Sequence, residues 1–201
     1  MIKNIIFDAG NVLVDVRWNE VMQGLGFDEK VAKRVTIATV HSDMWKEYDR
    51  SACSDEELIA SFVANDPELE REIRLFMEHE SEAIVGFSYA KDWVKSFKEK
   101  GYNCYILSNY SKSTHEKTKA ERSYEEYIDG AIYSWQVQMV KPEPEIYREL
   151  LMRYGLVPEE CVFLDDNLLN IEVARQLGVC AIHFTTKEDS EAELRKLGVQ
   201  C

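Results

Sequence analysis

The chain has 201 residues, a length typical of one α/β domain with a small insert rather than of two full domains. With 45% hydrophobic and 30% charged residues, its composition excludes a disordered or low-complexity chain and allows a substantial core. The formal net charge of −13 disfavours nucleic acid and anionic membranes as partners, and it requires a metal ion or a lysine at any site that binds phosphate.

Short apolar runs recur along the chain and predict buried strands. Their apolar residues are continuous rather than alternating, which is typical of a parallel sheet covered on both faces. The runs are Ile5–Phe7, Cys104–Leu107, Ala131–Tyr133, Val162–Leu164 and Cys180–Phe184.

Between these runs, apolar residues recur at helical spacing. Three such segments, which start near Trp93, Ile146 and Ile171, are each followed by a glycine that can end a helix. The repeated order of strand, helix and glycine predicts an α/β fold with a doubly wound, Rossmann-like parallel sheet.

The stretch over residues 18–83 interrupts this order. It contains no convincing strand but several acidic helical segments, one of which opens with a capping box at Ser54. The stretch is too long for a simple crossover between strands. We therefore predict a small all-helical cap over residues 18–83, placed at the carboxyl edge of the sheet, and a core domain formed by residues 1–17 and 84–201.

The five cysteines are scattered, without the spacing that a zinc site requires. Cys104, Cys161 and Cys180 fall in predicted strands, where thiols are usually buried and inert. The first residues lack the features of a signal peptide, and no apolar run approaches the roughly 20 residues that span a bilayer. We expect a cytoplasmic protein.

Polar residues follow the predicted strands. Asp8 ends the first strand beside Gly10, which places a carboxylate next to a flexible turn. An Asp that only caps this turn is the simpler interpretation of the residue alone. Ser108 and Asn109 end the second strand, where they could hold two phosphoryl oxygens or form the N-cap of the next helix.

Two further clusters carry charge. Lys141 precedes a helix whose start is fixed by prolines, so its ammonium group could complement a phosphate, although a solvated lysine is the usual alternative. Asp165 and Asp166 end another strand, and adjacent carboxylates are costly unless a cation neutralises them. A hard divalent cation meets that need, whereas an N-cap without metal would use only one of the two.

Together these clusters resemble the motifs of the haloacid dehalogenase (HAD) superfamily of phosphohydrolases. They occur in the family's order across nearly the whole chain, and they are most similar to a subgroup that includes alpha-glucose-1-phosphate phosphatases and the phosphatase domain of soluble epoxide hydrolases. The subgroup has a small helical cap after the first strand. The residues that carry the resemblance are FDAGNVLVDV (7–16), EYDRSACSDEEL (47–58, with the usual glycine replaced near Ser51), ILSN (106–109), KPEPEIY (141–147) and FLDDNLLNIEVARQLG (163–178).

The resemblance implies a role for each matching residue. Asp8 would be the nucleophile that forms an aspartyl-phosphate. It would also bind Mg²⁺, together with the carbonyl oxygen of Gly10 and the carboxylate of Asp166. The other expected roles are support of the metal site by Asp165 and Asn170, binding of the phosphoryl group by Ser108 and Asn109, and charge neutralisation and orientation of Asp8 by Lys141.

One position departs from the family. Most of its phosphatases have a second Asp two residues after the nucleophile, which serves as general acid and base, whereas this chain has Gly10. Such a group contributes about 10²–10⁴ in rate. A leaving group that needs little protonation, such as an anomeric sugar oxygen, would tolerate the loss best. Asp15 could supply a carboxylate, although a turn cap or salt bridge is its simpler role.

We therefore expect a Mg²⁺-dependent phosphatase that acts on a small phosphorylated metabolite, with a sugar phosphate as the favoured class. A 2-haloacid dehalogenase is an alternative, but the acidic pair disfavours it because dehalogenation needs no metal. A non-catalytic protein that binds a phosphometabolite is a second alternative, suggested by Gly10. Trp45 and Tyr48 could line the substrate pocket or belong to the core of the cap. The sequence carries no signal for an oligomeric state.

Overall fold

A computed structural model describes all 201 residues and contains a five-stranded parallel sheet of order β5-β4-β1-β6-β7. Strand β1 lies at its centre, and Ile5 pairs with Cys104 of β4 on one side and Val162 of β6 on the other. The doubly wound sheet predicted from the apolar runs is confirmed. The strands are β1 (Asn4–Phe7), β4 (Asn103–Ser108), β5 (Gly130–Tyr133), β6 (Cys161–Asp165) and β7 (Cys180–His183).

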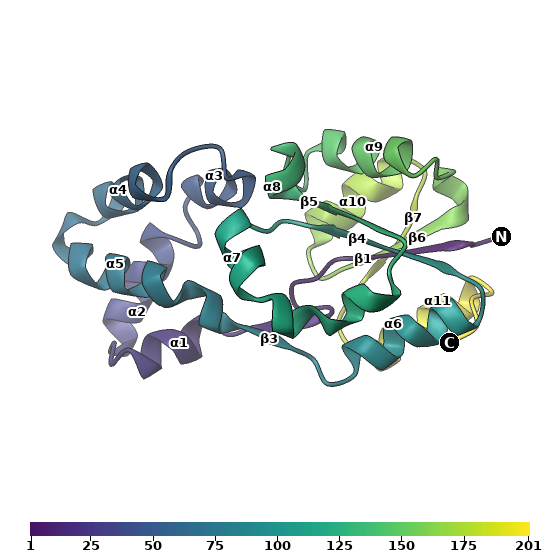
Figure 1. The fold of residues 1–201 in the computed structure, drawn as a ribbon, viewed down its shortest axis with the longest axis horizontal. Coiled ribbons are helices and arrows are strands. Elements are labelled where there is room, and N and C mark those ends of the chain that lie inside the picture. Colours follow the sequence, from purple (N-terminus) through teal and green to yellow (C-terminus); the bar gives the residue numbers. More distant parts are fainter.

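Helices cover both faces of the sheet (Figure 1). Successive residues of β1 point to opposite faces: Ile5 and Phe7 belong to one apolar cluster, and Ile6 belongs to another. The first cluster includes Trp93 of α6 (Ala90–Glu99), and α11 (Lys187–Lys196) lies on the same side. The second includes residues of α9 (Pro144–Arg153) and α10 (Leu168–Gln176). Shorter helices complete the core: α7 (Lys112–Lys117), η3 (Lys119–Tyr127), α8 (Ser134–Val137) and η4 (Pro158–Glu160).

A separate group of helices lies beyond the carboxyl ends of the strands (Figure 1). It has its own apolar core, in which Met22, Phe62 and Phe76 are fully buried. The capping box expected at Ser54 is present, with Glu57 as its second member. The helices are α1 (Trp18–Gly24), α2 (Glu29–Ala38), α3 (Met44–Arg50), α4 (Asp55–Asn65), η1 (Pro67–Leu69), α5 (Glu70–His79) and η2 (Glu80–Ala83).

An antiparallel ribbon that the sequence did not predict joins the two parts. It consists of β2 (Val14–Val16) and β3 (Ile84–Gly86), which flank the helical group in the sequence. Asp15 of β2 forms an ion pair of 2.7 Å with Arg17, which is the simple structural role considered for this carboxylate.

None of the helices combines the length and the apolar composition that a membrane span requires. All five cysteines are free thiols. Cys104 and Cys161 are buried as expected, whereas Cys180 is only partly buried.

Candidate active site

Four candidate residues meet at the carboxyl edge of the sheet because their strands are neighbours. Asp8 directly follows β1, Ser108 ends β4, and Asp165 ends β6. Lys141 comes from the loop before α9, where Pro144 occupies the first helical turn as the sequence predicted. The sheet thus brings together side chains that are up to 157 positions apart in the sequence.

Asp8 is held by three donors that converge on one of its oxygens. Its Oδ1 accepts hydrogen bonds from the Ser108 hydroxyl at 2.8 Å and the Ala9 amide at 2.6 Å, and the Lys141 Nζ lies 2.9 Å away. Its Oδ2 accepts no hydrogen bond from the protein, so this oxygen is available to another group. Asp8 is only 8% exposed.

Burial raises the pKa of Asp8 to about 7. The positive charge of Lys141 opposes this shift, and the negative charges of Asp165 and Asp166 add to it. Asp8 therefore needs further positive charge nearby to remain a carboxylate under neutral conditions.

Lys141 supplies the positive charge already present. Its side chain is almost fully buried, and its Nζ lies 2.7 Å from Asp165 Oδ2 as well as beside Asp8. Although burial acts to lower the pKa of Lys141, the carboxylates of Asp165 and Asp8 raise it above its ordinary value. The ammonium group therefore stays charged.

Asn109 fixes the backbone of this lysine. Its side-chain oxygen accepts from the Lys141 amide at 2.8 Å, and its Nδ2 donates to the Lys141 carbonyl at 3.0 Å. The sequence suggested that Asn109 holds phosphoryl oxygens. In the structure, both ends of its amide are used to position the loop that carries the lysine.

Asp165 is completely buried, and its oxygens are fully engaged. Asn170 Nδ2 lies 2.9 Å from both oxygens, the Asn167 amide donates to Oδ1 at 2.8 Å, and Lys141 donates to Oδ2. These bonds suit a group that orients Lys141 and Asp8 rather than one that binds a ligand.

Asp8, Asp165 and Asp166 form an acidic cluster whose oxygens lie within 4.8 Å of one another. Lys141 offsets one of the three negative charges, so a divalent cation would neutralise the remainder. Hard oxygen ligands are those that Mg²⁺ prefers. The free Oδ2 of Asp8 and the partly exposed Asp166 are the carboxylates best placed to hold it.

Asn11 is a site residue to which the sequence analysis assigned no role. Its Nδ2 donates to Asp166 Oδ2 at 2.8 Å, and its φ of 54° places it in the left-handed region, which asparagine tolerates well. The turn after β1 thereby contacts Asp166, which directly follows β6.

A cavity of about 110 Å³ opens between the core and the helical group, and it includes Gly10 in its wall. Trp45 and Tyr48 line this cavity and also pack in the apolar core of the helical group. Asp49 is the only acidic residue in the wall. The wall comprises Gly10, Val14, Val16, Trp18, Trp45, Tyr48, Asp49, Ile84, Asn109, Tyr110, Ser111 and Thr114.

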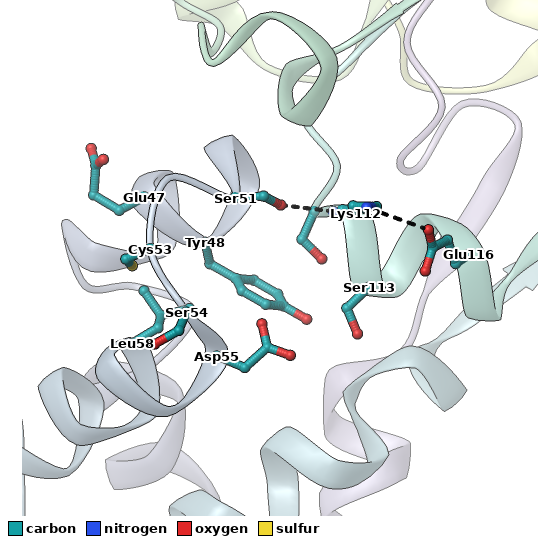
Figure 2. A pocket seen from close by; sticks show the side chains of 11 residues that line it. Glu47, Tyr48, Ser51, Cys53, Ser54, Asp55, Leu58, Lys112, Ser113 and Glu116 are labelled. Carbon is teal, nitrogen blue, oxygen red and sulfur yellow. Dashed lines mark hydrogen bonds and ion pairs between the residues drawn. The ribbon is translucent and has the colours of Figure 1, made fainter.

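A larger cleft of about 360 Å³ shares Tyr48 and Ser111 with this cavity. Figure 2 shows the Tyr48 side chain between α3 and α7, with Asp55 and Ser113 close to its hydroxyl end. Eight of its eleven lining residues are polar or charged: serines contribute hydroxyl groups, and Glu47, Asp55, Lys112 and Glu116 contribute charged groups.

The carboxyl end of α3 is anchored to the core. Ser134 Oγ donates to the Asp49 carbonyl at 2.7 Å, and the Lys112 amide donates to Ser51 Oγ at 2.9 Å. Arg50 forms an ion pair with Glu143, two residues after Lys141. Ser51 has φ of 51°, a left-handed conformation that explains why a glycine is usual near this position.

A model of one protein family, the haloacid dehalogenase-like hydrolases, matches residues 2–178 of this chain. A D-ribitol-5-phosphate phosphatase of Bacteroides thetaiotaomicron is 26% identical over 194 residues, which cover 89% of each chain. A sesquiterpene phosphatase of Aspergillus oryzae is 24% identical over 196 residues, which cover 97% of this chain and 96% of that one.

Solved structures share the fold. A HAD family enzyme of Bacteroides thetaiotaomicron, in complex with magnesium and inorganic phosphate, superposes with a TM-score of 0.73 at 24% identity, over 97% of this chain and all of that one. An L-2-haloacid dehalogenase of Xanthobacter autotrophicus gives a TM-score of 0.67 at 16% identity, over all of this chain and 85% of that one. The family match over most of the sequence, together with the shared fold, shows that this chain belongs to the haloacid dehalogenase-like hydrolases.

Proposed function

We propose that the protein is a Mg²⁺-dependent phosphatase that hydrolyses a small phosphate monoester through an aspartyl-phosphate on Asp8. The observation that carries this proposal is the surroundings of Asp8. One oxygen is fixed by Ser108, Ala9 and Lys141, the other is free, and Asp166 lies nearby. Positioning and electrostatic stabilisation are what phosphoryl transfer mainly requires.

In this mechanism Asp8 attacks phosphorus, the bond from phosphorus to the leaving oxygen breaks, and water later hydrolyses the aspartyl-phosphate. Ser108 and Lys141 lie against the nucleophile, where they can bind the phosphoryl oxygens. Asn109 holds the Lys141 backbone and borders the cavity, so it can contact the same group. Asp165 and Asn170 keep Lys141 in place.

Asp8, the carbonyl oxygen of Gly10 and Asp166 are the groups that would hold Mg²⁺. When bound, the ion would neutralise the carboxylates and the charge of the phosphoryl group. The acidic cluster supports this assignment, and it is the feature that disfavours a metal-independent dehalogenase.

We also propose that residues 18–83 act as a cap that sets specificity. The polar lining of the larger cleft supports a hydroxylated leaving group, such as that of a sugar phosphate. The ribitol-phosphate specificity of the bacterial relative is consistent with this class.

The test is a screen of phosphorylated metabolites with Mg²⁺ that measures phosphate release. Trapping of a phosphorylated enzyme by hydroxylamine in wild type, but not in an Asp8→Asn variant, would identify the intermediate. Release of halide from 2-chloropropionate in the presence of EDTA would instead support the dehalogenase alternative. Saturable binding of a phosphometabolite without any turnover would support the non-catalytic alternative.

A further inference from the structure

The proposed chemistry lacks a group that transfers protons. Departure of an alkoxide requires a proton on the leaving oxygen, and attack of water on the aspartyl-phosphate requires a base. Residue 10, which carries the acid/base Asp in most related phosphatases, is a glycine here. Asp15 is not available because its carboxylate is paired with Arg17 on the partly exposed ribbon.

We propose that Asp49 of helix α3 is the general acid and base of this site, an inference that rests on the proposed function. Asp49 and Gly10 line the same cavity of about 110 Å³, and Asp49 is the only carboxylate there. A helix of the cap thereby brings to the cavity the functional group that the turn after β1 lacks.

The Asp49 carboxylate has no other structural task. Its oxygens accept no hydrogen bond and form no ion pair, and the side chain is partly buried. By contrast, its neighbours on the helix are engaged: the Tyr48 hydroxyl lies 3.0 Å from Thr114 Oγ1, and Arg50 pairs with Glu47 and Glu143. Contacts on both sides of Asp49, together with the hydrogen bond from Ser134 to its carbonyl oxygen, fix its backbone against the core.

The charge environment suits an acid that is protonated at neutral pH. Burial raises the pKa of Asp49 to about 8. The carboxylates of Glu80 and Asp8 act in the same direction, and the positive charges of Lys141 and Arg50 act against it.

The proton balance closes over the two steps. When Asp8 attacks, the bond from phosphorus to the leaving oxygen breaks and the Asp49 carboxyl group donates its proton to that oxygen, which yields an alcohol. The Asp49 carboxylate then takes a proton from the water that attacks phosphorus. The bond to Asp8 breaks, phosphate leaves, and both side chains return to their starting states.

The experiment compares wild type with Asp49→Asn on two substrates, an aryl phosphate with an acidic phenol and a primary alkyl phosphate. Rapid-mixing kinetics measure the first turnover separately from steady state. We expect Asp49→Asn to slow phosphoryl transfer from the alkyl ester by about 10²-fold or more and from the aryl ester by less than about threefold. A burst of phenol should appear, since hydrolysis of the aspartyl-phosphate also loses its base.

Asp43→Asn, at an exposed position just before the same helix, is the matched control and should leave both rates unchanged. If Asp49→Asn does not fold, an Asp49→Ala variant should regain alkyl-phosphate turnover on addition of formate. Equal losses on both esters, or an unchanged alkyl rate in an active enzyme, would overturn the role of Asp49 alone. A wild-type enzyme that releases no phosphate from any ester would overturn the proposed function and this role together.

Discussion

The Nζ of Lys141 lies 2.9 Å from Oδ1 of Asp8, and both side chains are buried. The pair joins a residue after the central strand to a loop more than a hundred residues later. The lysine offsets only part of the negative charge, because Asp165 and Asp166 lie close to Asp8. The site therefore retains negative charge that a bound cation would neutralise.

Asp8→Asn should abolish phosphatase turnover while the fold stays intact. The amide keeps the shape of the side chain but cannot act as a nucleophile toward phosphorus. Phosphate release and the circular-dichroism spectrum of the purified variant check this. Substantial turnover by folded Asp8→Asn would place the nucleophile elsewhere.

Lys141→Met should lower the free energy of unfolding by about 3–5 kcal/mol at pH 8, because Asp8 and Asp165 would be left buried without their shared cation. Urea unfolding in EDTA measures the change. Lys91→Met is the matched control, since Lys91 pairs with Glu126 on the surface and such pairs contribute about 0–1 kcal/mol. Similar losses of unfolding free energy in the two variants would show that the buried ion pairs of Lys141 contribute no more to stability than a surface pair does.

Removal of metal should abolish turnover, and Asp166→Asn should raise the Mg²⁺ concentration needed for half-maximal activity by at least about tenfold. Asp166 is partly exposed beside Asp8, and its loss would remove one carboxylate of the cluster. A titration of activity with Mg²⁺ after exhaustive chelation provides the measurement. Asp92→Asn, an exposed change on α6, should not alter it. Full activity on an aryl phosphate without metal would refute the assignment.

The metal-free protein should lose stability as the pH rises from about 4 to about 7. The pKa of Asp8 is about 7 in the folded protein and about 3.8 in an unfolded chain, so the folded state holds a proton that the unfolded state has lost across this window. The contribution of Asp8 to the free energy of unfolding should therefore fall by up to about 1.4 kcal/mol per pH unit and level off above pH 7.

Asp8→Asn lacks this titration and should show a smaller slope than wild type. Urea unfolding of both proteins in EDTA at pH 5.5, 6.5 and 7.5 tests the difference, since all other groups are common to both. Parallel slopes would mean that Asp8 keeps an ordinary pKa in the folded protein.

Much of the fold followed from local patterns. Continuous apolar runs such as Ile5–Phe7 predicted the strands, and the polar residues directly after them predicted where Asp8, Ser108 and Asp165 would meet. These features could be predicted because the carboxyl ends of parallel strands meet at one edge of a sheet.

Features that depend on contacts between distant segments could not be predicted. The ribbon of β2 and β3 pairs three residues with three others about 70 positions away, and so short a strand leaves no periodic signal. Asp49 is one of many acidic residues in the cap, and only the docking of α3 on the core distinguishes it. The use of the Asn109 amide likewise depends on where the Lys141 loop lies.

The final prediction concerns Gly10 and Asp49 together. If Asp49 already transfers the proton, Gly10→Asp should change the alkyl-phosphate rate of wild type by less than about threefold. In the Asp49→Asn background, the same change should raise that rate by at least about tenfold, because a carboxylate returns to the cavity. A Cβ atom can be added at residue 10 without a clash, because it would meet only Val16 Cγ2, at an ordinary contact distance of 3.7 Å.

The four proteins of this cycle should be compared by first-turnover rates on alkyl and aryl phosphates. Gly10→Ala in the Asp49→Asn background is the matched control, since it adds the Cβ without the carboxylate and should restore nothing. An equal gain from Gly10→Asp in both backgrounds would mean that wild type lacks a proton donor and that Asp49 does not replace one. A gain only where Asp49 is missing would instead show that the two positions serve the same proton transfer, because additive effects are expected only of independent groups.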